Sequence, residues 1–493
     1  MLQNNLEINQ NSQLDTDYKK VFIQTYGCQM NEYDSQQIMQ LMHKNQYIKT
    51  DKHEDANLII LNTCHIREKA AEKVYSELGR VRLAKKNNNA IVVVAGCVAQ
   101  AEGEEIFKRA PYVDIVIGPQ TYHMLPEMVK NYNADPILYK HQINLDFIEE
   151  KKFDILEEKY KHFDFLNEES AQKQNEMHFS TSQFVSVQEG CDKFCAFCVV
   201  PFTRGAEFSR PVEKVMKEVL SAASKGAKEI VLLGQNVNAY HGIANITEEE
   251  INNFNNQNNN NKTTNPNNIE VNLAFLIDKI AKINQIERIR FTTSHPIDMD
   301  DDLINLFGSQ SKLMPFLNLP IQAGSNNVLK LMNRKYTKEQ YLEIIRKLKQ
   351  QRPDIAMSSD FIVGFPGETD DDFEETIDIV KKVGFAQSYS FKYSMRPGTP
   401  AIERDQVPED IKTKRLAKLQ EVIAASQYAF NEQFLGKELP VLFDKPGKKE
   451  GQIMGRTPYM QSVYLQDATS LKDQIIPVRI VQIFNNGLRG EII

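Results

Sequence analysis

Residues 90–100 read AIVVVAGCVAQ, an apolar and largely β-branched run that ends in a glycine followed by a cysteine. In two upstream stretches a similar run also leads to a cysteine: VFIQTYGCQMN at 21–31, again through a glycine, and LIILNTCHI at 58–66, without one. Short apolar runs of this kind predict buried β-strands. Helical patterns separate them, including EKAAEKVYSELGRVRLAKK at 68–86. The alternation of strand and helix predicts a parallel α/β sheet over residues 19–140.

Three cysteines stand at the ends of these predicted strands: Cys28, Cys64 and Cys97 each follow a strand by one or two residues. The carboxyl ends of parallel strands share one edge of the sheet, and open α/β sheets bind their ligands at that edge. We therefore expect the three thiols to converge there. Gly27 and Gly96 would let the backbone turn tightly beside them.

Composition narrows the class of protein. The chain has 493 residues, 41% apolar and 25% charged, which predicts a globular protein of several domains. No apolar run is long enough to span a membrane, and residues 1–20 lack the features of a signal or transit peptide. Six cysteines in so long a chain favour metal binding or catalysis in a reducing compartment over a disulfide framework. We expect a cytoplasmic protein with no membrane contact.

A second α/β pattern follows the charged segment 146–178, which we interpret as a linker or insertion. Six strands separated by helical stretches predict a partial (β/α)6 parallel barrel over residues 179–430. Asparagine makes up 11 of the 17 residues from 252 to 268, so we expect a disordered loop at about 245–269. The strand candidates are QFVSVQEG, EIVLLGQN, RIRFTTSH, PFLNLPIQ, IAMSSDFIV and SYSFKYSM.

One helix of this barrel and a separate C-terminal domain are also visible in the sequence. Thr337 and Gln340 match a capping box, and Leu342, Ile345 and Leu348 mark an apolar helical stripe.

Short alternating segments after the helical pattern ends (ELPVLFD, YMQSVYLQ and IIPVRIVQIF) predict a small all-β barrel at 433–493.

The sequence is most specific at GCDKFCAFCVVPFTRG, residues 190–205. Here Cys191, Cys195 and Cys198 form C-x3-C-x2-C directly after the first barrel strand. Zinc sites usually take four ligands from paired cysteines, so a structural zinc site would need a distant fourth ligand. Three thiolates in one loop instead suit three irons of a 4Fe–4S cluster whose fourth iron stays open.

This loop resembles the cluster motif of the radical S-adenosylmethionine (SAM) superfamily. Seven motifs along the chain carry a closer resemblance: TYGCQMNEYDS, EGCDKFCAFCVVPFTRG, LGQNVNAY, RFTTSHP, LPIQAGSNNVLKLMNR, SSDFIVGFPGET and SFKYSMRPGTPA. Together they span roughly residues 19–400 and resemble the MiaB-type tRNA methylthiotransferases, and the C-terminal segment is similar to that family's TRAM domain. The resemblance implies two 4Fe–4S clusters that use every cysteine in the chain. The auxiliary cluster is held by Cys28, Cys64 and Cys97, and the SAM-binding cluster by Cys191, Cys195 and Cys198.

The resemblance also implies contacts to SAM. Phe197 would lie near the adenine of SAM, and Gly364 and Pro366 would shape its pocket. Gln235 and Asn236 end the second barrel strand and are candidate contacts to SAM or substrate, with turn-forming amides as an equal alternative.

Other polar side chains have a plainer alternative to a functional role. His295 could act in the pocket, but a hydrogen-bonded structural histidine is the better interpretation. Arg204 and Arg210 flank the cluster loop, where contact with phosphate or the SAM carboxylate and a solvated surface role are equal alternatives. In the C-terminal barrel, five basic residues are candidate RNA contacts, although each alone would serve solubility: Lys448, Lys449, Arg456, Arg479 and Arg489.

The family's reaction inserts sulfur at C2 of N6-isopentenyladenosine beside the tRNA anticodon, and a second SAM then donates the methyl group. The C2–H bond is neither acidic nor electrophilic, so acid–base catalysis cannot break it. A cofactor-derived radical must therefore do so. The implied partners are the tRNA anticodon stem-loop, an electron donor such as flavodoxin or ferredoxin, and sulfur and cluster-assembly donors. We expect a monomer.

Two other functions stay open. One is a methylthiotransferase acting on threonylcarbamoyl-adenosine or on a ribosomal-protein aspartate, and the other is a non-enzymatic iron–sulfur carrier. The Gln-Met-Asn after Cys28 and the VVPFTRG tail favour the isopentenyl-adenosine branch. The six-strand repeat and the C-terminal barrel argue against a carrier, which needs neither. Release of 5′-deoxyadenosine from SAM would separate an enzyme from a carrier.

Overall fold

The computed structural model describes residues 18–65, 68–147, 180–247, 268–484 and 487–493. The chain divides into two compact units, Met1–Ile155 and Leu156–Ile493, and each is described here by itself. Among the described residues, we find no helix whose length and apolar character would let it cross a lipid bilayer.

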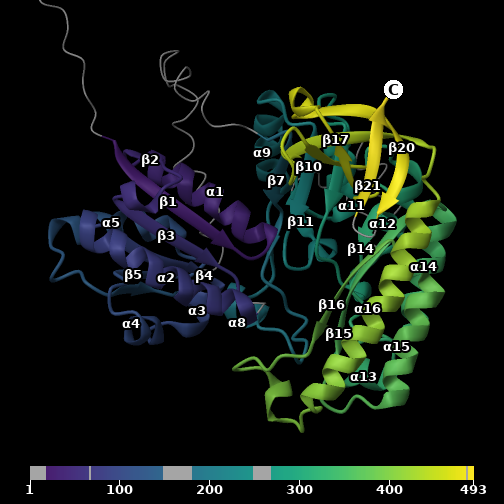
Figure 1. The fold of residues 1–493 in the computed structure, drawn as a ribbon, viewed down its shortest axis with the longest axis horizontal. Helices are drawn as coiled ribbons and strands as arrows, with labels where there is room; N and C mark the ends of the chain where they lie inside the picture. Colours follow the sequence, from purple (N-terminus) through teal and green to yellow (C-terminus); the bar gives the residue numbers. More distant parts are fainter. Residues whose placement is uncertain (1–17, 66–67, 148–179, 248–267, 485–486) are drawn as a thin grey trace, which may run out of the picture. The chain divides into compact units, whose positions relative to one another are not determined.

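The first unit is built on one six-stranded parallel sheet in the order β2-β1-β3-β4-β5-β6 (Figure 1). Its strands are β1 (Lys19–Tyr26), β2 (Tyr47–Lys49), β3 (Leu58–Thr63), β4 (Ile91–Gly96), β5 (Ile115–Ile117) and β6 (Gln142–Asn144). Its helices are α1 (Gln29–His43), α2 (Glu68–Asn88), α3 (Cys97–Glu102), α4 (Glu105–Arg109) and α5 (Leu125–Ala134). The predicted parallel α/β sheet is confirmed, with three further short strands, β2, β5 and β6.

Helices cover both faces of this sheet because the central strands are apolar on both sides. Leu58 and Ile60 of β3 belong to one buried cluster, which includes residues of α1 and α5. Ile59 and Leu61 of the same strand belong to a second cluster, which includes residues of α2. The side chains of a strand alternate between its faces, so a fully apolar strand serves two cores at once.

The second unit contains six parallel strands in two groups of three, β7-β10-β13 and β14-β15-β16. A parallel bridge between Ile289 of β13 and Leu313 connects the first group to the segment before β14. This arrangement confirms the predicted partial barrel. The strands are β7 (Ser182–Ser186), β10 (Glu229–Leu233), β13 (Arg288–Phe291), β14 (Phe316–Asn318), β15 (Ala356–Val363) and β16 (Gln387–Lys392).

Helices follow the barrel strands, and two short antiparallel pairs are added to them. The helices are α8 (Val200–Arg204), α9 (Val212–Ser224), α11 (Leu273–Ala281), α12 (Asp301–Ser309), α13 (Asn326–Leu331), α14 (Lys338–Gln351), α15 (Asp370–Val383) and α16 (Glu409–Glu432). The pairs are β8 (Gln188–Glu189) with β9 (Phe208–Ser209), and β11 (His241–Ala244) with β12 (Ile269–Asn272). The asparagine-rich segment connects β11 to β12. Most of it, and most of the predicted linker at 146–178, lies outside the described residues.

The capping box predicted for α14 is present. The Thr337 side chain accepts a hydrogen bond from the backbone N–H of Gln340, and the Gln340 side chain accepts one from the backbone N–H of Thr337. The buried residues of α14 are Tyr341, Ile345 and Leu348, while Leu342 is only partly buried. Ile345 and Leu348 are thus buried as predicted, and Tyr341 rather than Leu342 is the third buried residue of the helix.

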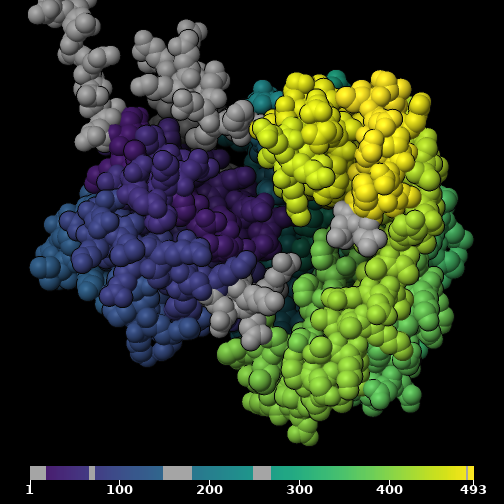
Figure 2. Space-filling view, in the orientation of Figure 1, coloured from purple at the N-terminus to yellow at the C-terminus, as the bar shows by residue number. Residues whose placement is uncertain are grey.

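The C-terminal segment forms a closed five-stranded barrel in the order β17-β18-β19-β21-β20, which confirms the predicted all-β domain. Its strands are β17 (Glu438–Pro446), β18 (Ile453–Arg456), β19 (Ser462–Leu465), β20 (Gln474–Phe484) and β21 (Gly487–Ile492). In Figure 2 it is the yellow surface beside the green part of the chain.

The C-terminal barrel packs against the amino-terminal ends of the parallel strands of the second unit. Arg288, the first residue of β13, donates to the carbonyls of Pro440 (2.7 Å) and Arg456 (3.1 Å). Tyr459 donates to Asp354, which lies just before β15. All of these contacts are at the amino-terminal ends of the strands. The C-terminal barrel therefore lies at the opposite end of the strands from the loops that follow them.

Candidate functional site

The first unit places three cysteines along the carboxyl edge of its sheet. Tyr26 of β1 aligns with Thr63 of β3, and Thr63 aligns with Gly96 of β4, so these three strands end level with one another. Cys64 and Cys97 follow directly, and Cys28 caps α1 two residues after β1. The predicted strand-end placement of all three cysteines is therefore what the structure shows.

Two glycines let neighbouring segments approach closely at this edge. Gly27 (φ 142°) and Gly96 (φ 91°) both have backbone conformations that side chains rarely allow. A Cβ on Gly27 would lie 2.3 Å from Cβ of Cys64, and one on Gly96 would lie 2.5 Å from Oδ1 of Asn62. A side chain at Gly27 would therefore collide with Cys64, and one at Gly96 would collide with Asn62 and Thr63.

A buried amide network supports the same edge. Asn62 donates from Nδ2 to the carbonyl of Asn31 and to Oγ of Ser35, both at 2.9 Å. Asn31 accepts a hydrogen bond from the Cys28 thiol at 3.3 Å. Both asparagines are fully buried. Sequence reasoning missed Asn62, although a polar residue inside the apolar run LIILNT was a signal that could have found it.

In the second unit, the Cys191–Cys198 loop follows β8 at the carboxyl end of the barrel strands. The backbone N–H of Cys191 donates to the Gly205 carbonyl, and that of Cys198 to the Cys195 carbonyl. Burial and the neighbouring Cys195 together raise the pKa of Cys191 to about 11 and that of Cys198 to about 12. The cysteines of the loop therefore lie close enough to affect one another, and at neutral pH metal binding would displace the protons of Cys191 and Cys198.

These thiols suit a cluster better than a single ion. Three soft sulfur donors within eight residues are the donor set that an iron–sulfur cluster takes.

Residues 332–334, which end the motif LPIQAGSNNVLKLMNR, hold the cysteine loop in place by hydrogen bonds. Sequence reasoning did not assign this role to them. The backbone N–H of Ala196 donates to the Met332 carbonyl at 3.0 Å. Asn333 donates from Nδ2 to the Phe194 carbonyl at 2.8 Å, and Arg334 donates from Nη1 to Sγ of Cys195 at 3.3 Å. Contacts that join residues 139 apart in sequence leave no local signal.

Three of the predicted SAM-pocket residues lie in one region. The ring of Phe197 meets that of Phe365 edge-on, with centroids 6.5 Å apart, and Phe365 stands between Gly364 and Pro366. Gly364 has φ 68°, and a Cβ there would lie 2.4 Å from Cγ of Lys412. The contact brings Phe197 beside the Gly364–Pro366 turn, and the contacts of these residues to SAM stay a prediction.

Gln235 and Asn236 lie at the same end of the barrel but have structural partners. Gln188 accepts hydrogen bonds from both of their backbone N–H groups at 2.9 Å. The Gln235 side chain accepts from the N–H of Gly190, and Asn236 donates from Nδ2 to Asp298 at 2.8 Å. Both amides thus shape the turn that follows β10, and Asn236 also orients an acidic residue of the neighbouring pocket.

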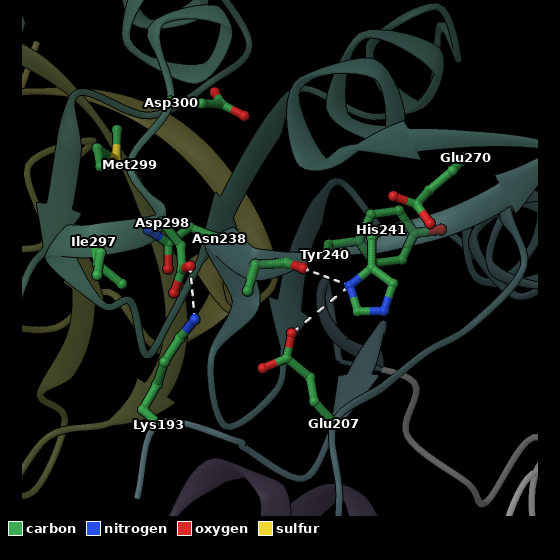
Figure 3. Close-up of a pocket in the computed structure, with 11 residues that line it drawn as sticks. Lys193, Glu207, Asn238, Tyr240, His241, Glu270, Ile297, Asp298, Met299 and Asp300 are labelled. Atoms are coloured by element: carbon green, nitrogen blue, oxygen red, sulfur yellow. Dashed lines mark hydrogen bonds and ion pairs between the residues drawn. The ribbon is translucent and has the colours of Figure 1, made fainter. Parts of the chain in front are cut away.

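That pocket is a cavity of about 450 Å³ at the mouth of the barrel (Figure 3). Lys193 of the cysteine loop and Asp298 point toward each other in it and form an ion pair at 2.7 Å. Glu207 faces His241 at 3.6 Å. Burial raises the pKa of Glu207, while the Lys193 ammonium opposes that rise. The lining also includes Asn238, Ala239, Tyr240, Glu270, Ile297, Met299 and Asp300.

Two arginines that flank the cysteine loop, Arg204 and Arg210, are buried and form ion pairs. Arg204 is buried and donates to Glu189 at 2.9 Å. Arg210 is also buried, and it donates to Glu218 and to the Ser186 carbonyl, both at 2.6 Å. A solvated surface role is therefore wrong for both. Their guanidinium groups hold the segments around the cysteine loop by buried ion pairs.

His295 is a structural histidine, as the sequence interpretation favoured. Its Nδ1 accepts from the N–H of Ile297 at 3.2 Å, and its ring meets that of Tyr336 edge-on. Burial and the nearby Arg334 cation together lower its pKa to about 2, so the cationic form of this imidazole is disfavoured.

The candidate RNA contacts lie mainly on the surface of the C-terminal barrel. Lys448, Lys449, Arg479 and Arg489 are exposed, and Arg456 is partly buried. Arg479 pairs with Glu438 and Arg489 with Glu491, both exposed pairs that are screened by salt.

Comparison with known proteins identifies the family. Curated tRNA-2-methylthio-N(6)-dimethylallyladenosine synthases are similar along nearly the whole chain. The Rickettsia felis protein is 54% identical over 483 residues, 96% of this chain and 100% of its own length. The Rickettsia bellii protein is 55% identical over 482 residues, 96% of this chain and 99% of its own length. The chain belongs to this family.

Family models match the three parts of the chain separately. They are those of uncharacterized protein family UPF0004 at residues 20–118, the radical SAM superfamily at 185–380 and the TRAM domain at 432–493. A solved structure supports the fold: the radical SAM methyltransferase TsrM from Kitasatospora setae, with tryptophan and a SAM analogue bound. It has a TM-score of 0.50 and 11% identity, covering 78% of this chain and 75% of its own. The chain is thus an enzyme of the radical SAM type, with a TRAM domain.

Proposed function

We propose that this protein inserts sulfur at C2 of N6-dimethylallyladenosine, the isopentenylated base beside the tRNA anticodon, and methylates the inserted sulfur. One observation carries the proposal. The six cysteines form two sets of three, and each set stands at the carboxyl ends of parallel strands in a different compact unit. A methylthiotransferase needs two such sets, one for the radical and one for the sulfur.

The proposed parts of the chain follow this division. Residues 19–140 hold an auxiliary 4Fe–4S cluster on Cys28, Cys64 and Cys97. Residues 179–430 hold the SAM-binding 4Fe–4S cluster on the cysteine loop, after a linker at 146–178, and residues 433–493 bind RNA. When bound, the loop cluster and SAM supply the carbon radical that can remove an unreactive hydrogen from the base.

The residues of this chain prepare the loop for that chemistry. The Lys193–Asp298 ion pair ties the cysteine loop to the segment after β13. The Ala196 and Asn333 hydrogen bonds tie it to the segment after α13. Phe197 and the Gly364–Pro366 turn line the adjacent space with an aromatic face and closely packed backbone. Such fixed loops keep reacting groups in place and keep water away from them.

The position of the C-terminal barrel suggests how tRNA is held. It lies at the opposite end of the barrel strands from the cysteine loop. We infer that it contacts RNA away from the reacting base, through phosphates rather than through base edges. The base itself must leave the stack of the anticodon loop to reach the cysteine loop.

The remaining partners follow from the reaction. A low-potential electron donor of the flavodoxin or ferredoxin class would reduce the loop cluster, and separate donors would supply sulfur and assemble both clusters. We propose a monomer that acts in the cytoplasm, where its tRNA substrate is.

A direct test uses the purified, anaerobically reconstituted protein with isopentenylated tRNA, SAM and a reductant. Nucleoside mass spectrometry should detect 2-methylthio-N6-isopentenyladenosine, together with 5′-deoxyadenosine. Product on threonylcarbamoyl-adenosine tRNA or on a ribosomal protein, with none on the isopentenylated tRNA, would contradict the proposal. Binding of clusters without any cleavage of SAM would indicate an iron–sulfur carrier instead.

A further inference from the structure

The side chain of Arg334 lies against the cysteine loop with only 4% of its surface exposed. Its Nη1 donates to Sγ of Cys195 at 3.3 Å, and its Nη2 donates to the Pro320 carbonyl at 2.7 Å. Its Nε donates to the hydroxyl of Tyr336 at 2.8 Å, and that hydroxyl donates in turn to the Ile321 carbonyl at 2.9 Å. The planar guanidinium is thus fixed from three sides.

The partners of Arg334 leave its charge without an obvious counter-ion. Among the described residues, they are one sulfur, one carbonyl and one hydroxyl, and none is a carboxylate. A buried cation is costly unless an anion lies beside it. The sulfur of Cys195 is the one partner that becomes anionic, when it is a thiolate bound to iron. The positive charge of Arg334 is therefore balanced only when the cysteine loop carries an anionic group.

We propose that Arg334 is a positioning residue that makes the cluster of the cysteine loop easier to reduce. The inference rests on the proposed function, because it requires the 4Fe–4S cluster on Cys191, Cys195 and Cys198. Reduction moves one electron from a low-potential donor, which is oxidised by one electron, to the cluster, and no bond or proton need change. The added negative charge spreads onto the thiolate sulfurs. A cationic hydrogen bond to one of them stabilises the reduced cluster more than the oxidised one.

The neighbouring residue Asn333 provides a matched control. It donates to the Phe194 carbonyl, so it fastens the same loop but carries no charge and touches no sulfur. Its backbone has φ 61°, which glycine adopts freely. Asn333→Gly therefore removes the side-chain hydrogen bond with little backbone strain. A general loosening of the loop should affect Asn333→Gly and Arg334 variants alike, whereas an electrostatic effect should appear only in the latter.

The test measures the midpoint potential of the loop cluster in the full-length, reconstituted protein, by redox titration with dithionite followed by electron paramagnetic resonance. The loop signal is the one lost when Cys191, Cys195 and Cys198 are replaced by alanine. In Arg334→Gln, the equilibrium constant for reduction should fall about tenfold or more, equivalent to about 59 mV for one electron. Arg334→Lys should fall between this variant and the wild type. Asn333→Gly should retain the wild-type potential.

Each contrary result has a separate meaning. Arg334→Gln with a full cluster and an unchanged potential overturns the inference, even if its affinity for SAM has fallen, because Arg334 would then recognise SAM instead. If Arg334→Gln does not hold a cluster, Arg334→Lys decides, and an unchanged potential in that variant overturns the inference. A wild-type protein with no reducible cluster on the loop contradicts the proposed function, and the inference fails with it.

Discussion

Arg415 of α16 donates from Nη1 to Oε2 of Glu368 across 2.6 Å, and both side chains are buried. The same carboxylate oxygen accepts the backbone N–H of Gly364 at 2.6 Å. Through this pair, the helix that precedes the C-terminal barrel fixes the turn predicted to line the SAM pocket. Loss of one partner of a buried ion pair of this kind strongly destabilises the folded protein, because the other charge is left buried without a counter-ion.

The first prediction concerns Arg415→Met. Burial raises the pKa of Glu368, while the Gly364 N–H and the Arg415 cation oppose that rise. Without Arg415, the folded-state pKa should rise further above the unfolded value, so the protein would be most stable with Glu368 protonated. That contribution is present at low pH and is lost as pH rises through the folded-state pKa. We expect a loss of about 3–5 kcal/mol near pH 8 and a smaller loss near pH 5.5.

Urea denaturation at the two pH values measures this difference. Lys414→Met is the control, since it removes a cation from the exposed neighbouring position of α16. It should change stability little at either pH. Equal losses for Arg415→Met at both pH values would show that Glu368 does not titrate in response to Arg415.

The features that the sequence predicted are those encoded locally. The capping box of Thr337 and Gln340 lies within one helical turn, and each strand-end cysteine adjoins its own apolar run. Parallel topology then brings those strand ends to one edge without any further information.

The features that it missed depend on distant partners. A solvated surface role was one of two equal alternatives for Arg204, but Glu189, 15 residues earlier, accepts its hydrogen bond in the interior. Arg334 meets Cys195 only because α13 follows a strand on the other group of the barrel. Burial of a charged residue is a property of the assembled fold, and a single sequence gives no measure of it.

A second prediction tests the ligands of the cysteine loop. Replacement of Cys191, Cys195 and Cys198 by alanine should remove about half of the iron from the reconstituted protein and abolish cleavage of SAM. The reason is that the other three thiols lie in a separate compact unit with its own core. Iron and sulfide analysis together with 5′-deoxyadenosine measurement checks this. A triple variant that keeps full iron would show that the ligands are elsewhere.

A third prediction concerns RNA binding by the C-terminal barrel. Lys448 and Lys449 are exposed on the segment between β17 and β18, at the opposite end of the strands from the cysteine loop. Replacing both with glutamate should weaken tRNA binding and reduce its salt dependence, because phosphate contacts release counterions. Release of 5′-deoxyadenosine without tRNA should not change. Lys414→Glu, which reverses one charge on α16 instead of two, is the control, and an effect half as large from it would indicate only a general electrostatic attraction.

The last prediction separates the two halves of the proposed reaction. Replacement of Cys28, Cys64 and Cys97 by alanine should leave release of 5′-deoxyadenosine intact, because the cysteine loop and its fastening residues Met332–Arg334 lie in the other unit. Formation of the methylthio product should stop, because no sulfur would be held for insertion. Both are measured in one reaction on isopentenylated tRNA.

The alternative for these three cysteines is a structural one, since Cys64 and Cys97 are buried at the edge of the sheet. Serine replacements, which nearly keep the size of the side chain, control for it: a purely structural role predicts lower stability but continued product formation. Urea denaturation of the alanine and serine variants shows how much stability each loses. A stable serine variant that still makes methylthio product would exclude the auxiliary thiols as the holders of the sulfur. A stable variant that cleaves SAM without making product would assign them that role.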